Sequence, residues 1–148
     1  MDRIIHISTE LPVDPARAFA YFTDKGLLES WLTAEADVEP VEGGKYELFW
    51  TPEDREFDST IGCRVTAVEP GSLLAFEWKG PKQYSAFMNE CDPLTHVTVS
   101  FAPVGDGTKV HLVHSGWRST PEWEEAREWF VRVWGGAFKQ LSAVASPE

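Results

Sequence analysis

Cysteine is scarce in this sequence, with only Cys63 and Cys91 among 148 residues. Two cysteines do not make the disulfide framework of a small secreted domain, and neither lies in a metal-binding spacing, so we expect two free thiols. No apolar run approaches the ~18 residues of a membrane-spanning helix. The first residues lack the basic, apolar and small-residue order of a signal peptide. These absences favour a cytoplasmic protein without membrane insertion.

Basic residues are also few. The chain has 13 Lys and Arg against 24 Asp and Glu, a formal net charge of −11. Such a molecule repels phosphate backbones and anionic membranes at long range, which argues against nucleic acid as a partner. Acidic side chains are expected on solvated loops and helix faces. They are densest in two stretches of the sequence, which contain Glu35, Asp37, Glu39 and Glu42, and Glu53, Asp54, Glu56 and Asp58.

The length suits one domain, and the composition supplies a core. Hydrophobic residues make up 43% of the chain and aromatic residues 13%. We therefore expect a single domain spanning residues 1–148, without internal repeats or linkers.

The pattern of elements predicts an α+β fold. Residues 4–11 alternate as a half-buried strand, and short helices are expected to follow Asp14-Pro15 and Asp24, ending near residues 22 and 32. Further antiparallel strands are predicted over residues 45–50, 60–69, 73–79, 95–102 and 108–115. The long connection from Gly80 to Leu94 carries more apolar side chains than a solvated loop needs. It is expected to be either a lid or a homodimer contact.

A long amphipathic helix is predicted near the C-terminus. Ser119 or Thr120 caps it, Pro121 suits its first turn, and apolar residues then recur at steps of three and four for about six turns. The pair Gly135-Gly136 interrupts this helix at a cost of about 1 kcal/mol per glycine. Close backbone packing or a bend would explain the pair, and so would space for a ligand.

Several motifs occur in an order that resembles a known family. They include DPARAFAYFTD (14–24), VEGGKYEL (41–48) and WGGAFKQL (134–141). The chain resembles the homologues of the activator of the Hsp90 ATPase, within the START-like superfamily. That resemblance implies a helix-grip fold, a curved antiparallel sheet wrapped around a long C-terminal helix, with an internal cavity. Members of the superfamily include lipid carriers, cyclases and co-chaperones, so the fold alone does not give the function.

Strand alternation and aromatic content suggest which residues line such a cavity. Seven tryptophans exceed what a compact core of this size needs, and large rings with polar edges suit flat or apolar ligands. The predicted ligand-binding residues are Trp31, Tyr46, Trp50, Phe76, Trp78, Phe101, His114, Phe130 and Trp134. An ordinary aromatic core is the alternative interpretation of the same set.

Two histidines, His111 and His114, are three positions apart on one predicted strand. Residues at that spacing point to opposite faces of a sheet, so no shared metal site is expected. His114 faces inward with Val110 and Leu112, where it either anchors the hairpin end or offers a polar handle to a ligand.

Three functions remain open from the sequence. The leading one is a binding protein for an apolar or aromatic small molecule, without a cofactor. The second is a co-chaperone that contacts an ATPase through its surface. The third is a cyclase or hydrolase in which His114 works with Tyr46 or Tyr84, although no nucleophile and base are paired in the sequence.

Overall fold

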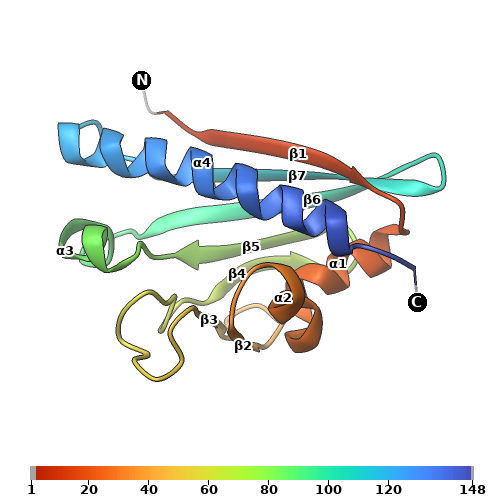
Figure 1. Cartoon of the computed structure of the whole chain (residues 1–148), viewed down its shortest axis with the longest axis horizontal. Coiled ribbons are helices and arrows are strands. Elements are labelled where there is room, and N and C mark those ends of the chain that lie inside the picture. The colour runs from red at the N-terminus through yellow and green to blue at the C-terminus, as the bar shows by residue number, and fades with distance from the viewer. Residues whose placement is uncertain (1–2, 148) are drawn as a thin grey trace.

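Five antiparallel strands form the main sheet of the computed structural model, which describes residues 3–147. They are β1 (Ile5–Leu11), β4 (Val65–Glu69), β5 (Leu73–Trp78), β6 (Thr95–Val104) and β7 (Gly107–Ser115). Their order across the sheet is β1-β7-β6-β5-β4, so β4 to β7 form a meander and β1 adds to its far edge (Figure 1). The α+β class and the antiparallel pairing are confirmed.

Side-chain alternation along β7 follows the prediction. Val110, Leu112 and His114 are fully buried, whereas His111 lies half-buried on the outer face. β6 alternates in register with β7 and pairs Val97 with His114. The inward direction of His114 is therefore confirmed.

A second, two-stranded sheet was only half predicted. It pairs β2 (Glu35–Val38) with β3 (Tyr46–Phe49). The expectation that Glu35 and Asp37 lie on loops or helix faces is wrong, because both belong to β2, where Ala36 points inward and is buried. Four residues give too little alternation to recognise a strand.

The strand predicted over residues 60–69 begins only at Val65. A turn occupies residues 61 and 62, where Gly62 has a φ of +87°. Isolated bridges from Lys45 to Arg64 and from Phe49 to Ser59 then attach β3 to the segment that precedes β4.

Two short helices, α1 (Pro15–Thr23) and α2 (Lys25–Trp31), follow β1 as predicted. Asp14 and Asp24 cap them, and each carboxylate accepts the backbone N–H three residues on, at 2.8 Å and 3.1 Å. Such caps satisfy backbone donors that the first helical turn leaves free.

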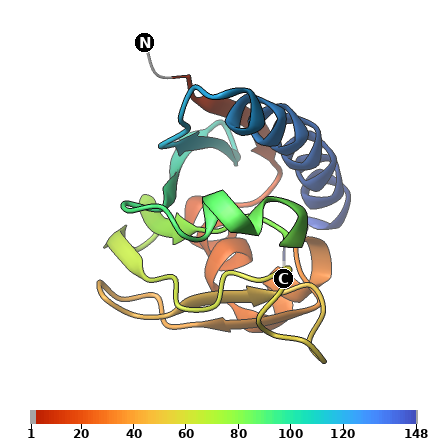
Figure 2. The same ribbon diagram turned by 90° about the vertical axis from the view of Figure 1, so that its left-hand side faces the viewer.

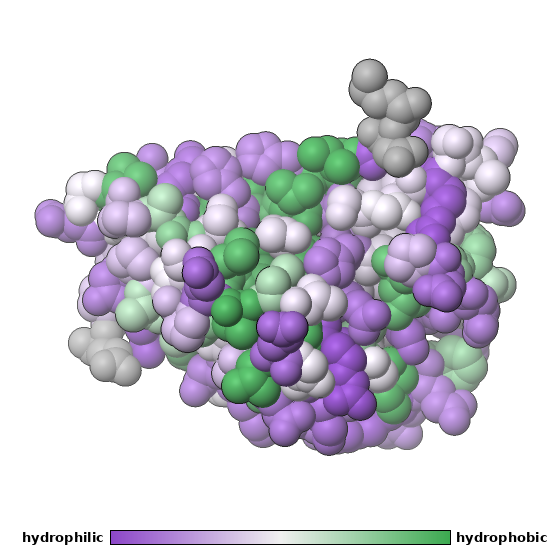
Figure 3. All heavy atoms as spheres, turned by 180° about the vertical axis from the view of Figure 1, so that it is seen from behind, coloured by the Kyte–Doolittle hydropathy of each residue, from purple (hydrophilic) through white to green (hydrophobic). Residues whose placement is uncertain are grey.

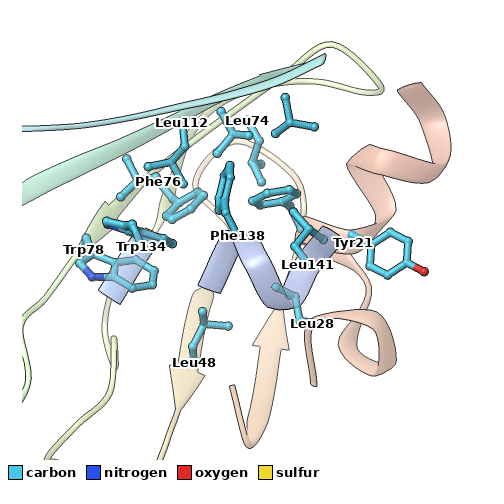
Figure 4. Packing of buried hydrophobic residues seen from close by; sticks show 14 of the residues in the cluster. Tyr21, Leu28, Leu48, Leu74, Phe76, Trp78, Leu112, Trp134, Phe138 and Leu141 are labelled. Atoms are coloured by element: carbon cyan, nitrogen blue, oxygen red, sulfur yellow. The ribbon is translucent and has the colours of Figure 1, made fainter. Parts of the chain in front are cut away.

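The C-terminal helix α4 (Pro121–Val144) is capped by Thr120, and Figure 2 shows it closing the side of the molecule opposite the curving strands. Within residues 3–147, neither α4 nor any shorter helix has the length and apolar composition of a membrane span. The buried face of α4 consists of Trp123, Ala126, Phe130, Trp134, Phe138 and Leu141. Figure 4 shows Phe138 and Trp134 facing Phe76 and Leu112 of the sheet. The predicted helix-grip arrangement is confirmed.

The glycine pair in α4 is not explained by close packing. A Cβ atom added at Gly135 or at Gly136 would meet no atom within 4 Å beyond the helix's own backbone. Close backbone packing, one of the explanations that the sequence left open, therefore does not account for these residues.

Gly135→Ala and Gly136→Ala are each expected to stabilise the protein by about 0.5–1 kcal/mol, because alanine restricts the unfolded chain and a methyl group has room in the fold. Urea denaturation of each variant measures this gain. Gly44→Ala is the control and should destabilise, since its Cβ would lie 2.3 Å from the Glu39 carbonyl oxygen. A loss of stability in both helix variants would contradict the packing described here.

Candidate binding pocket

A cavity of about 340 Å³ lies between α4, the end of β5 and the loop that follows β3. Its walls are mainly aromatic, comprising Trp50, Trp78, Trp129, Phe130 and Trp134. Leu32, Val133 and Ala137 add aliphatic surface. Trp50 and Val133 are 39% and 38% exposed, so the cavity opens to solvent along their side. Its size and lining fall within the range of small-molecule sites.

Secondary structure places each wall. Trp78 is the last residue of β5, and its ring lies 5.3 Å from that of Trp134 on α4. The ring of Trp50 packs edge-on against Trp78 at 5.8 Å. The strand and the loop thus each supply one indole ring to the aromatic wall, and α4 supplies two, Trp129 and Trp134.

Polar groups at the mouth of the pocket hold its loop in place. Lys79 Nζ donates to the carbonyl oxygen of Ile61 at 2.7 Å. The backbone N–H of Lys82 donates to Asp58 Oδ1 at 2.9 Å, and Ser59 Oγ donates to the Arg55 carbonyl at 2.6 Å. These groups therefore stabilise the rim.

His114 supports the pocket wall from behind. The Trp134 indole N–H donates to His114 Nδ1 at 3.1 Å. Since an indole only donates, Nδ1 carries no proton, and Nε2 donates to Thr95 Oγ1 at 3.0 Å. Burial, with a smaller effect of nearby His96, lowers the pKa of His114 to about 3. The neutral ring thus fixes the orientation of Trp134.

Four of the nine predicted site residues line this pocket, namely Trp50, Trp78, Phe130 and Trp134. Trp31, Tyr46, Phe76, Phe101 and His114 lie outside its lining and belong to the surrounding core.

The predicted aromatic residues that lie outside the pocket pack and hydrogen-bond within the core. Tyr46 stacks on Phe76 with centroids 3.7 Å apart, and its hydroxyl donates to the Phe22 carbonyl at 2.7 Å. Phe101 packs edge-on against Phe22 at 5.5 Å. The indole N–H of Trp31 donates to a backbone carbonyl at 2.9 Å.

The sequence prediction missed Trp129, Leu32, Val133 and Ala137 as pocket residues. Trp129, Val133 and Ala137 are spaced by four and form a stripe along one edge of the apolar face of α4. This periodicity was readable from the sequence, but it does not separate a pocket edge from ordinary core.

Two of the three groups suggested for acid–base chemistry, His114 and Tyr46, already have hydrogen-bond partners. Both ring nitrogens of His114 and the hydroxyl of Tyr46 have partners inside the protein. Burial also raises the pKa of Tyr46 well above its ordinary value. Tyr84 packs its ring against Trp129 at 5.7 Å.

The cysteines and outer histidines show no assembled reactive centre. Cys63 and Cys91 are free thiols, as predicted, and burial raises the pKa of Cys63 to about 12. His111 contacts His6 on the outer face, with Nδ1 and Nε2 3.0 Å apart. Among residues 3–147, no three His, Cys, Asp or Glu side chains are grouped to hold a metal ion.

The segment from Gly80 to Leu94 contains two short helices, η1 (Lys82–Tyr84) and α3 (Ser85–Met88). Its aromatic side chains pack onto α4, with Phe87 lying 5.0 Å from Trp123. Met88 is fully buried. The apolar residues of this segment are thus used within the chain, next to the pocket residues Gly80 and Pro81.

Several solved structures have the same fold. Protein MLL2253 from Mesorhizobium loti is 25% identical, covers 95% of each chain and has a TM-score of 0.76. An HSP90 activator from Plasmodium falciparum is also 25% identical, over 95% of this chain and 94% of its own, with a TM-score of 0.71. CalU16 from Micromonospora echinospora is 20% identical, over 99% and 78%, with a TM-score of 0.70.

No curated protein matches the chain. A family model, described as "Activator of Hsp90 ATPase homolog 1-like protein", matches residues 12–146. The ordered motifs, the helix-grip fold and this match over most of the sequence agree. The chain therefore belongs to the family of activator of Hsp90 ATPase homolog 1-like proteins.

Proposed function

We propose that this protein binds a flat, apolar or aromatic small molecule in the pocket between α4, the end of β5 and the loop after β3. The observation that carries the proposal is the aromatic wall formed by Trp50, Trp78, Trp129 and Trp134, which opens to solvent. Trp50 is 39% exposed, whereas Trp78 and Trp134 are buried beside it. Covering the exposed ring with an apolar ligand lowers the free energy of the complex. His114 contributes indirectly, by holding Trp134 in position.

The segment from Gly80 to Leu94 serves as a lid in this proposal. It begins in the pocket lining at Gly80 and Pro81 and rests on α4 through Tyr84 and Phe87. Because only a few aromatic contacts hold this segment on α4, the segment could move away from the helix to admit a ligand. The homodimer alternative is less supported, because Tyr84 and Met88 are buried within their own chain and Phe87 packs on Trp123.

The test is a titration with fluorene, a flat hydrocarbon of three fused rings. We expect saturable 1:1 binding that quenches tryptophan fluorescence, with a Kd on the order of 10 µM for a ligand of this size. Protein unfolded in guanidinium is the control and should bind no fluorene. The proposal fails if the folded protein shows no saturable binding up to the solubility limit of the probe.

A second candidate function is favoured by the likeness to the HSP90 activator from Plasmodium falciparum. In this second function, the protein would contact a chaperone ATPase through its own surface. Figure 3 shows one face of the molecule, where hydrophobic and hydrophilic residues are interspersed, so a contact there would combine apolar and polar groups. Adding the protein to Hsp90 should raise the ATPase rate. An unchanged rate, together with no complex in a pull-down, would exclude this function.

The cytoplasm is the location proposed for either function. Cys63 and Cys91 are free thiols, and a reducing compartment keeps thiols in that state.

A further inference from the structure

One hydrogen-bond donor in the pocket wall has no partner. The indole nitrogen of Trp78 is buried, and no acceptor among residues 3–147 lies within hydrogen-bond distance of it. The ring of Trp50 packs edge-on nearby, but an aromatic face is a weak acceptor compared with an oxygen. Buried donors are nearly always satisfied, so an orphan beside a pocket calls for an explanation.

Other indoles in the molecule show that this is a local feature. Trp31, Trp50 and Trp117 donate their N–H groups to backbone carbonyls, at 2.9, 2.8 and 3.0 Å. Trp134 donates to His114. Trp50 and Trp134 line the same pocket as Trp78, so the pocket environment does not prevent a tryptophan from finding a partner.

The ring that carries this donor is part of the pocket wall. Trp78 ends β5 and lies between Trp50 and Trp134 in the aromatic wall. Figure 4 shows its nitrogen on the edge of the ring that is turned away from Phe76. The polar rim groups Asp58 and Ser59 are held by the loop's own hydrogen bonds.

We propose that the Trp78 N–H donates to an oxygen at the edge of the bound molecule. The preferred ligand is then an uncharged, flat ring system that carries a ketone, quinone or ether oxygen. An anion fits less well, because Lys79, the cation in the pocket lining, is engaged with Ile61 and the chain carries a net charge of −11. This inference rests on the proposed function and adds a specificity-determining residue to it.

The experiment compares fluorenone with fluorene, two molecules of nearly the same shape that differ by one carbonyl oxygen. Wild-type protein should bind fluorenone about tenfold more tightly, since one hydrogen bond to a buried donor is worth about that factor. In Trp78→Phe the preference should disappear or reverse, because the carbonyl then loses its hydration without gaining a partner. Trp50→Phe is the matched control and should keep the preference, since its N–H already donates to Leu32.

The outcomes separate this inference from the proposed function. If wild-type protein binds both probes equally, or if Trp78→Phe keeps the preference, this inference fails and the proposed function stands. If neither probe binds, both fail.

A second measurement needs no variant of Trp78. In ¹H–¹⁵N spectra of the wild-type protein, the assigned indole proton of Trp78 should move clearly downfield with fluorenone, whereas fluorene, which offers no oxygen acceptor, should shift it only through the ring current of its aromatic rings. Equal shifts with the two probes would overturn the inference even if Trp78→Phe does not fold.

Discussion

Acidification from pH 6.5 to pH 5 should lower the free energy of unfolding by about 2 kcal/mol through His114 alone. The folded protein keeps this ring neutral, because it is fully buried and its Nδ1 accepts a hydrogen bond from Trp134. Its pKa is lowered to about 3, whereas a histidine in the unfolded chain titrates near ~6.5.

The sign of the effect follows from these two pKa values. Above pH ~6.5 the His114 ring is neutral in both the folded and the unfolded state. It therefore adds no pH dependence to the free energy of unfolding in that range. Below that pH the unfolded chain takes up a proton that the folded protein does not, so stability falls by about 1.4 kcal/mol per pH unit. The fall ends near pH 3, where the folded ring also becomes protonated.

Urea denaturation at pH 6.5 and pH 5 measures the effect, with His114→Gln as the variant that cannot titrate. This variant should be less stable at both pH values, yet should lose about 2 kcal/mol less than wild type on acidification. His96→Gln is the comparison. Burial also lowers the pKa of His96, but that ring is half-buried, so its removal should change the slope less. Equal slopes in wild type and His114→Gln would contradict the buried neutral histidine.

Filling the pocket should abolish most binding of an apolar probe. Ala137 lies in the pocket lining on α4, and Ala137→Trp would place an indole ring in a cavity of about 340 Å³. We expect the Kd for fluorene to rise about 30-fold, roughly 2 kcal/mol, because the new ring occupies the surface that the ligand would cover. Isothermal titration calorimetry provides the measurement without relying on tryptophan emission.

Lys139→Trp is the matched control for this variant. Lys139 is exposed on the same helix, about half a turn away from the pocket residues, and is absent from the pocket lining. It should leave the Kd for fluorene unchanged. If Ala137→Trp folds and binds fluorene as tightly as wild type, the ligand does not occupy this cavity.

Much of the fold could be predicted because its signals are local. Pro121 and the acidic residues after it mark the start of α4, and Asp14 and Asp24 mark α1 and α2. Alternation along β6 and β7 gives the correct inward face. The four-residue strand β2 was missed because a strand that short depends on its partner more than on its own sequence.

The candidate site was harder to predict, because its composition depends on tertiary packing. The alternation of side chains along a strand predicted that Trp50 faces inward with Tyr46. However, β3 ends at Phe49, and Trp50 lies 39% exposed at the rim of the pocket. Whether His114 would meet a ligand or another side chain was not readable from its strand. Only the fold brings Trp134 and Thr95 to its two nitrogens.

The pocket itself is tested most directly by the indole N–H signals in ¹H–¹⁵N spectra during a titration with fluorene. The signals of Trp50, Trp78, Trp129 and Trp134 should shift together and saturate. The signal of Trp31 should stay in place, because its N–H donates to the Tyr21 carbonyl away from the pocket lining. Shifts at Trp31 alone, or no shift at the four pocket tryptophans, would contradict binding in this pocket.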